Sequence, residues 1–234
     1  IENRLVLEDL VSQPELAKAN FQIVHYDGPD RRGVDVGLLY RADQFEYLGS
    51  ESIPFSFEGT QVPITLTKEE QERFRTRDIL MVHGLIAGEH FAFYVTHLPS
   101  RIGGKGGDLR SLGGDIIRRH SEKMSQKFPG IKMVVMGDMN SEAKDDLQGM
   151  NNLMIGLAKE GKGTHKYHGI WSCLDQFYVS SRLLEKAGAR IFAPAWLQEE
   201  DTKYLDLQPK RTYVGFRYHD GYSDHLPIVL HVSQ

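Results

Sequence analysis

Two short segments of the chain bring oxygen and nitrogen ligand atoms close together. Asp138 and Asn140 stand at the end of one apolar run, and Asp224 and His225 stand just before another. A carboxylate and an amide at the carboxyl end of a buried strand direct their oxygen atoms to a point outside the sheet, where ligands of α/β proteins usually bind. Such atoms suit a hard cation such as Mg²⁺, and an aspartate beside a histidine joins a metal ligand to a proton-transfer group.

Both segments also have a plainer interpretation. Glycine, aspartate and asparagine are common turn residues, so Asp138 and Asn140 are consistent with a simple turn at a strand end. Ser223 and Asp224 are likewise consistent with a local capping turn, and His225 with a surface histidine. Neither segment decides between the two interpretations by itself.

Three further residues have types that suit phosphate chemistry. His97 ends an apolar stretch and is followed by Arg101 in the glycine-rich segment 99–108. An imidazole can supply a proton and a guanidinium can clamp a phosphate through two hydrogen bonds, although the histidine can equally mark a strand end before a mobile linker. Asp175 heads another apolar stretch, where its carboxylate can hydrogen-bond a histidine and hold its tautomer.

The elements that must position these side chains follow from the apolar pattern. Apolar residues at spacings of three and four predict an amphipathic helix over Leu109–Phe128, ended by a proline and a glycine. A shorter helix is predicted over Glu2–Val11, and residues 49–72 predict short strands or loops. Strands are predicted at Val34–Tyr40, Ile79–Ala87, Phe91–Thr96, Ile131–Met136, Gln176–Val179 and Leu226–Val232. Helices and strands in this order favour an α/β fold with a mixed sheet.

The composition excludes several classes of protein. The 234 residues carry 28 lysine and arginine against 32 aspartate and glutamate residues, a net charge of −4, so no overall basic field points to nucleic acid. A single cysteine, Cys173, excludes an internal disulfide, and unbroken apolar runs such as Met133–Met136 are too short to span a membrane. The cellular compartment and the oligomeric state stay open.

Four motifs together resemble a known family. They are Thr-His-Leu at 96–98, Gly-Asp-Met-Asn at 137–140, Leu-Asp-Gln-Phe at 174–177 and Ser-Asp-His-Leu-Pro at 223–227. In type and in order they resemble the endonuclease/exonuclease/phosphatase superfamily, which includes deoxyribonuclease I-like enzymes. The resemblance implies a four-layer α/β sandwich of two mixed sheets flanked by helices.

The resemblance also implies a role for each matching residue. Glu2 and Asp224 match metal ligands, and the implied metal is Mg²⁺ or Mn²⁺. The residues that match groups at the attacking water, the phosphate or the leaving oxygen are His97, Asp138, Asn140, Asp175 and His225. Arg101 is expected to contact the substrate. Either Asp138 or the pair of Asp175 and His225 is expected to accept the proton of the water.

Members of the superfamily begin with a strand that ends in an asparagine and precedes the metal-binding glutamate. No residue precedes Ile1 in this sequence. We therefore expect residues 1–234 to form a single domain that lacks the first strand of the family.

The function implied is divalent-metal-dependent hydrolysis of a phosphodiester or a phosphomonoester by in-line attack of water. The alternative is a non-catalytic member of the fold that only binds a ligand, but a binding protein has no chemical need for Asp175, Asp224 and His225 together. Residues 211–218 alternate arginine and aromatic residues. Because the chain is acidic, we interpret this segment as a solvated face, and a small phosphate ester is as credible a substrate as nucleic acid.

Other signals are set aside. The spacing of His165 and His168 is compatible with zinc, but no cysteine or third ligand lies nearby in the sequence, so a loop is expected there. Residues 156–163 miss the phosphate-loop pattern because Gly163 stands where serine or threonine is needed.

Overall fold

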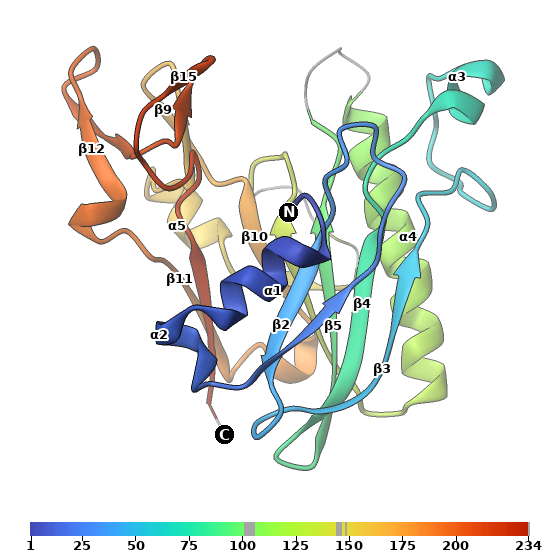
Figure 1. Cartoon of the computed structure of the whole chain (residues 1–234). Helices are drawn as coiled ribbons and strands as arrows, with labels where there is room; N and C mark the ends of the chain where they lie inside the picture. Colours follow the sequence, from blue (N-terminus) through green and yellow to red (C-terminus); the bar gives the residue numbers. More distant parts are fainter. Residues whose placement is uncertain (101–105, 144–146, 148, 234) are drawn as a thin grey trace. The chain divides into compact units, whose positions relative to one another are not determined.

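The computed structural model describes residues 1–100, 106–143, 147 and 149–233 (Figure 1). These residues form two compact units. The first unit contains residues 1–140 together with 147 and 149, and the second contains residues 141–143 and 150–233. The single domain predicted for residues 1–234 stays a prediction. Within the described ranges, every helix is too short or too polar to cross a lipid bilayer.

The first unit is built around a mixed sheet. Its strands run in the order β3-β4-β5-β6, with antiparallel pairing from β3 to β5 and parallel pairing between β5 and β6. Strands β1 and β2 form a separate antiparallel pair. The elements are α1 (Arg4–Ser12), α2 (Pro14–Ala17), β1 (Phe21–His25), β2 (Gly37–Arg41), β3 (Glu46–Ile53), α3 (Lys68–Arg73), β4 (Ile79–Ile86), β5 (Glu89–His97), α4 (Gly106–Lys127) and β6 (Lys132–Asp138).

Both faces of this mixed sheet are covered, which explains why β4 is apolar along most of its length. On one face, Leu80 and Val82 pack with Val24 of β1, and burying each of these side chains contributes about 1.5–3 kcal/mol. On the other face, the Tyr94 hydroxyl lies 2.9 Å from Nδ1 of His120 on α4. Helix α1 in turn packs Leu7 against β2. The first unit is therefore layered as helix, sheet, sheet and helix, as Figure 1 shows.

Local signals account for most of the boundaries in the first unit. Helix α1 begins where the Asn3 side chain accepts a hydrogen bond from the amide of Val6. Helix α3 begins with a reciprocal capping box between Thr67 and Glu70. The prediction of short strands or loops for residues 49–72 missed this helix and the length of β3, because the pattern of apolar residues there is weak.

The second unit consists of short antiparallel pairs. The pairs are β7 with β10, β8 with β9, β11 with β16, β12 with β13 and β14 with β15. The elements are β7 (Asn151–Asn152), α5 (Ile155–Lys159), β8 (His165–Tyr167), β9 (Ile170–Ser172), β10 (Asp175–Val179), η1 (Ser181–Leu183), β11 (Ala187–Ile191), η2 (Ala195–Leu197), β12 (Gln198–Asp201), β13 (Asp206–Pro209), β14 (Tyr213–Val214), β15 (Arg217–Tyr218) and β16 (Ile228–Val232).

Buried polar side chains hold the strands of the second unit together. The fully buried Gln176 donates to the carbonyls of Ser141 and Cys173 at 2.6 and 3.0 Å and accepts from Asn152 and Tyr178. A buried amide with all these bonds made fixes its strand in one register, because any shift would leave the amide unpaired. Strand β10 therefore presents its first residue, Asp175, in one defined position.

Candidate active site

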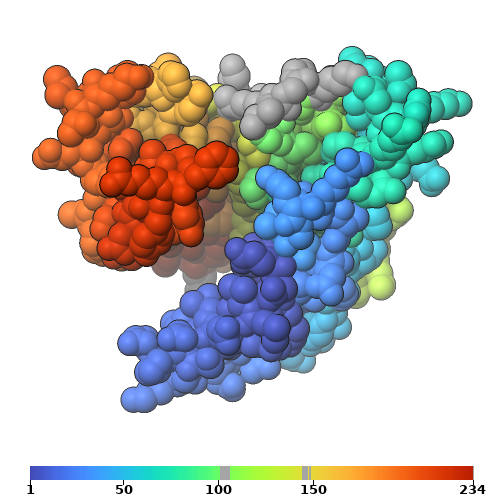
Figure 2. All heavy atoms as spheres, turned by 45° about the horizontal axis from the view of Figure 1, so that its top comes forward, coloured from blue at the N-terminus to red at the C-terminus, as the bar shows by residue number. Residues whose placement is uncertain are grey.

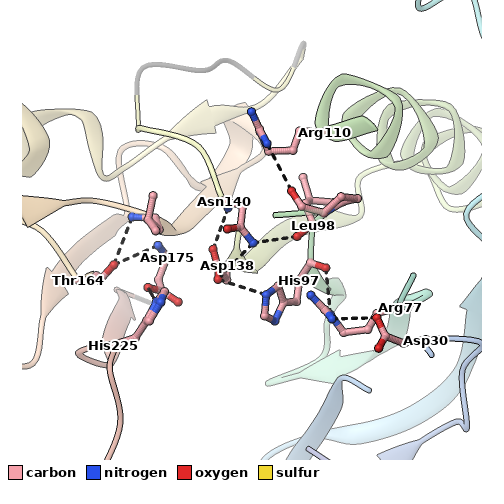
Figure 3. A network of polar contacts seen from close by, with 12 residues as sticks. Asp30, Arg77, His97, Leu98, Arg110, Asp138, Asn140, Thr164, Asp175 and His225 are labelled. Atoms are coloured by element: carbon pink, nitrogen blue, oxygen red, sulfur yellow. Dashed lines mark hydrogen bonds and ion pairs between the residues drawn. The ribbon is translucent and has the colours of Figure 1, made fainter. Parts of the chain in front are cut away.

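Three of the predicted residues meet at the end of β6 in the first unit, and we call them the Asp138 cluster: His97, Asp138 and Asn140. The parallel register sets His97 of β5 opposite Asp138 of β6, and His97 Nε2 lies 3.3 Å from Asp138 Oδ2 (Figure 3). The backbone amide of Asn140 donates a hydrogen bond to Asp138 Oδ1 at 2.8 Å. The side-chain Nδ2 of Asn140 donates to the Leu98 carbonyl at 2.9 Å. The strand end thus orients both oxygen-bearing side chains, as the sequence predicted.

The backbone explains why the segment has this sequence. Gly137 has φ +132°, and a Cβ atom there would lie 1.9 Å from the Thr96 carbonyl oxygen, so only glycine fits. Asn140 has φ +49°, a left-handed conformation that asparagine tolerates better than most residues. The tight turn directs the Asp138 and Asn140 side chains to the same place.

A buried ion pair between Arg77 and Asp30 contacts the main chain at His97. The Arg77 side chain is 3% exposed; its Nε donates to the His97 carbonyl at 3.2 Å and its Nη1 lies 3.1 Å from Asp30 Oδ2. Burial acts to raise the pKa of Asp30, but hydrogen bonds from Arg32 and the charge of Arg77 outweigh it and leave the pKa below its usual value. The main chain at His97 is therefore held by a charged group.

The second unit holds another set, the His225 cluster, which consists of His165, Asp175, Asp224 and His225. His225 Nδ1 lies 2.6 Å from Asp175 Oδ2, a short charge-assisted hydrogen bond (Figure 3). The buried Thr164 hydroxyl accepts from the amides of Leu174 and Asp175, each at 3.2 Å. One threonine therefore ties the strand that carries Asp175 to the segment that carries His165.

His165 is a member of this cluster that the sequence analysis did not select. It forms an antiparallel bridge with His225, and the two ring centres lie 4.8 Å apart. Burial lowers the pKa of His165, with further lowering from His225 and Arg211 and an opposing effect of Asp224. The neutral ring keeps a lone pair for a ligand or a proton. Its partner stands far away in the sequence, so no local spacing signals it.

Ligand atoms of His165, Asp224 and His225 all lie within 4.8 Å of one another. Two imidazole nitrogens and a carboxylate oxygen form a donor set that suits a divalent transition metal, and the carboxylate also suits Mg²⁺. The His225 ring already donates Nδ1–H to Asp175, as the rings of metal-binding histidines usually do toward a second carboxylate. The residues present therefore fit a divalent cation.

Comparisons with known proteins show the family to which this chain belongs. A family model described as "Endonuclease/Exonuclease/phosphatase family" matches residues 1–234. The chain belongs to the endonuclease/exonuclease/phosphatase family. A search of curated proteins by sequence found no match.

Solved structures share the fold of this family member at low sequence identity. Truncated TDP2 from Caenorhabditis elegans is 16% identical, with 100% of this chain and 82% of that chain covered and a TM-score of 0.62. TDP2 from D. rerio complexed with single-strand DNA product is 16% identical, with 98% and 82% covered and a TM-score of 0.54. The mannosyl-6-phosphatase from Bacteroides thetaiotaomicron is 15% identical, with 97% and 82% covered and a TM-score of 0.58. The predicted α/β fold is confirmed.

Glu2, which the family resemblance predicts to be a metal ligand, is not part of either cluster. Glu2 is exposed and directly precedes Asn3, the cap of α1; among the described residues it forms no hydrogen bond or ion pair. Arg101 lies outside the described residues. The metal-binding role of Glu2 and the substrate contact of Arg101 stay predictions.

The first unit holds a second group of residues that could bind a metal ion, His25, Asp27 and Asp35. His25 Nε2 lies 3.3 Å from Asp35 Oδ2, and His25 Nδ1 lies 4.0 Å from Asp27 Oδ1. The His25 side chain is 3% exposed, and Asp35 also accepts a hydrogen bond from the Gly28 amide. These contacts hold the loop that presents Asp30 to Arg77, so we interpret the group as structural.

Proposed function

We propose that the chain is a divalent-metal-dependent phosphoesterase that hydrolyses its substrate by in-line attack of water on phosphorus. Membership of the endonuclease/exonuclease/phosphatase family supports this reaction class. The observation that carries the proposal is the hydrogen bond of 2.6 Å between His225 and Asp175, next to the carboxylate of Asp224. This arrangement joins a proton acceptor to a metal ligand in adjacent residues.

His225 is the proposed general base. Because Asp175 accepts the Nδ1 proton, the neutral imidazole carries its lone pair on Nε2, from which it can take a proton of the attacking water. The imidazolium formed is stabilised by the Asp175 carboxylate, which itself stays ionised. The bond also fixes the plane of the ring, so no reorientation is needed during the reaction.

Asp224 and His165 are the proposed ligands of Mg²⁺ or Mn²⁺, with Glu2 as the further ligand predicted by the family resemblance. An imidazole ligand favours Mn²⁺ over Mg²⁺. When bound, the cation supplies positive charge beside the phosphate oxygens. The support for this role is that a ligand atom of His165 lies within 4.8 Å of a carboxylate oxygen of Asp224. The Nε2 atom of His225 is not used as a ligand in this proposal.

The Asp138 cluster is proposed to act on the water and the phosphate in the same reaction. The side-chain amide of Asn140 is held by the Leu98 carbonyl, so its conformation is already fixed before the substrate binds. It can therefore position an oxygen atom of the water or the phosphate with little further loss of entropy. Asp138 accepts a hydrogen bond from the Asn140 backbone and can orient a water molecule. His97 is the proposed donor to the leaving oxygen, and Arg101 the proposed contact to the substrate.

The proposed substrate is a phosphodiester or a phosphomonoester. One similar structure is of a protein complexed with a single-strand DNA product, and another is named a mannosyl-6-phosphatase. These two names include both kinds of ester, and we extend that range to this chain.

The proposal is tested by metal titration. Protein stripped of metal with EDTA is supplied with Mg²⁺ or Mn²⁺ and assayed with bis(p-nitrophenyl) phosphate and p-nitrophenyl phosphate. We expect hydrolysis only with added metal, and its loss in His225→Gln. His219→Gln is the matched control, because His219 also pairs with a carboxylate, Glu199 at 2.7 Å, outside the cluster.

Two results would contradict the proposal. Hydrolysis that persists in EDTA would remove the metal requirement, and hydrolysis unchanged in His225→Gln would remove the proposed base. Binding of Mn²⁺ without hydrolysis of either ester would favour the alternative, a member of the fold that binds a ligand without catalysis.

A further inference from the structure

We propose that the β14–β15 hairpin and the residues at its base form a stacking surface for single-stranded nucleic acid. This inference rests on the proposed function and narrows its substrate class. The hairpin has register Tyr213 to Tyr218 and Val214 to Arg217, with Gly215 and Phe216 as the two residues of the turn. Gly215 has φ +60°, which glycine adopts at no steric cost.

Aromatic side chains are exposed all along this segment. Phe216 at the tip is 106% exposed relative to the reference state, and the other four rings are more than half exposed: Trp196, Tyr213, Tyr218 and Tyr222. Figure 2 shows this segment, coloured orange to red, on the surface of the second unit. A single exposed apolar side chain is ordinary, but several rings on one short segment mark a surface that binds something.

The rings are paired in ways that leave their faces open. Tyr213 and Tyr218 lie 5.6 Å apart at 67°, and Trp196 and Tyr222 lie 5.3 Å apart at 80°. In such edge-to-face pairs each ring supports its neighbour without covering both of its faces. A planar base can therefore stack on them at little cost in side-chain entropy.

Positive charges lie between the rings. Lys210 Nζ lies 5.8 Å from the centre of the Tyr222 ring, and Arg217 is exposed beside Tyr218. In the part of the chain that the structure describes, neither Lys210 nor Arg217 forms an ion pair. By contrast, Arg32 in the first unit is paired with Asp30. Lysine and arginine charges without carboxylate partners are suited to phosphates.

The base of the hairpin is fastened to the segment that leads into the His225 cluster. The Tyr222 amide donates to the Lys210 carbonyl at 2.7 Å, and the Thr212 hydroxyl donates to the Tyr222 carbonyl at 2.8 Å. A Cβ atom on Gly221 would lie 2.2 Å from the Arg211 carbonyl, so glycine is required where the two segments touch. Tyr222 is followed after one residue by Asp224 and His225, so the exposed rings lead into the proposed catalytic residues.

These features favour single-stranded nucleic acid over other partners. Every base has an aromatic face that can stack on a ring, and every phosphate carries a negative charge that pairs with lysine or arginine. Rings and cations on one surface therefore match the bases and phosphates of a single strand. Duplex DNA keeps its bases stacked inside and cannot use the rings.

The test measures binding without turnover. Fluorescence anisotropy of labelled oligonucleotides of about 16 nucleotides, as ssDNA and as ssRNA, is recorded in EDTA. We expect the wild-type chain to bind at least one of them, and Phe216→Ala and Tyr213→Ala each to weaken binding about 5- to 100-fold. Leu205→Asn is the matched control, because Leu205 is 91% exposed in the β12–β13 turn and has φ +53°, which asparagine tolerates.

The outcomes separate this inference from the proposed function. Circular dichroism and thermal unfolding check that Phe216→Ala and Tyr213→Ala fold, and hydrolysis of bis(p-nitrophenyl) phosphate by the wild-type chain and by Leu205→Asn reports the proposed function separately. Normal hydrolysis together with oligonucleotide binding unaffected by either ring variant would overturn the stacking surface and leave the proposed function standing. Loss of oligonucleotide binding in the ring variants of a chain that hydrolyses no ester would support the surface and contradict the proposed function. Stronger binding to duplex DNA or to phosphatidylserine vesicles would overturn the inference.

Discussion

Each unit of the molecule holds a histidine beside an aspartate, but the two pairs differ in geometry. In the second unit, His225 Nδ1 lies 2.6 Å from Asp175 Oδ2, and the His225 side chain is 23% exposed. In the first unit, His97 uses its other ring nitrogen, Nε2, lies 3.3 Å from Asp138 Oδ2 and is 41% exposed. The shorter and less exposed pair is the stronger interaction, because solvent screens it less.

The difference indicates that the two histidine–aspartate pairs suit different roles. The His225 pair joins Asp175 of β10 to a bridge residue 50 positions away in the sequence and leaves Nε2 as the nitrogen for the proposed proton transfer. The His97 pair joins neighbouring positions of two parallel strands, and its carboxylate is shared with the Asn140 amide. We therefore expect proton transfer to depend on His225 and positioning to depend on the Asp138 cluster. Three measurements test this division, and a fourth concerns a histidine pair without a carboxylate.

The largest effect is expected from His225→Gln. Removal of a positioned general base costs roughly 10²- to 10⁴-fold in rate, and glutamine keeps a polar side chain of similar size. The measurement is kcat for bis(p-nitrophenyl) phosphate with saturating metal, with His219→Gln as the control. A loss smaller than that of His97→Gln would reverse the roles assigned to the two pairs.

The next effect is expected from Asp175→Asn. The amide still fills the position but no longer accepts the Nδ1 proton as a carboxylate does, so the imidazole loses its fixed tautomer and its counter-charge. Loss of such a supporting carboxylate costs about 10- to 100-fold in activity. Asp206→Asn serves as the control, because Asp206 is paired with Lys166 and lies outside the cluster. If the pH–rate profile of Asp175→Asn matches that of the wild type, Asp175 does not act through His225.

A smaller effect is expected from His97→Gln. The pair at 3.3 Å is partly exposed, and a donor to the leaving oxygen matters less when the leaving group is good. We expect roughly a tenfold loss with an alkyl phosphate ester and a smaller loss with a p-nitrophenyl ester. Equal losses with both esters would show that His97 acts by positioning rather than by donating a proton.

The smallest effect concerns a histidine pair that has no carboxylate between its rings. His83 Nδ1 lies 3.0 Å from His90 Nε2, and burial lowers the pKa of both rings below the usual 6.5. The unfolded chain therefore binds more protons than the folded one as pH falls below about 6.5, so the free energy of unfolding decreases there and is fully retained above it.

Denaturant unfolding between about pH 8 and pH 5.5 measures this decrease. His90→Gln should flatten the loss of stability below pH 6.5, because the glutamine does not titrate. An unchanged slope would assign the pH dependence of the free energy of unfolding to other groups.

Local patterns were enough for the long elements of the first unit. The stripe over Leu109–Phe128 became α4, and the two apolar runs beginning at Ile79 and Phe91 became the β4–β5 hairpin. These patterns predict the elements correctly because burial determines where apolar residues stand. A helix with one buried face has apolar residues at spacings of three and four, and a strand buried on both faces is a continuous apolar run. The strands β8, β9 and β12–β15 had no such signal, because each has only two to four residues.

The identity of the side chains available for chemistry, and the strand ends at which they stand, can be read from the amino-acid sequence. The turn at Gly137 and Asn140 and the pairing of Asp175 with a histidine follow from motifs that can be read along the chain. The tertiary structure alone decided that His165 lies against His225, which ring nitrogen each histidine uses, and that the rings around Phe216 stay exposed. These facts depend on contacts between residues far apart in the chain. Such contacts are determined by close packing and by the need of buried polar groups for hydrogen bonds throughout the unit, and not by local spacing.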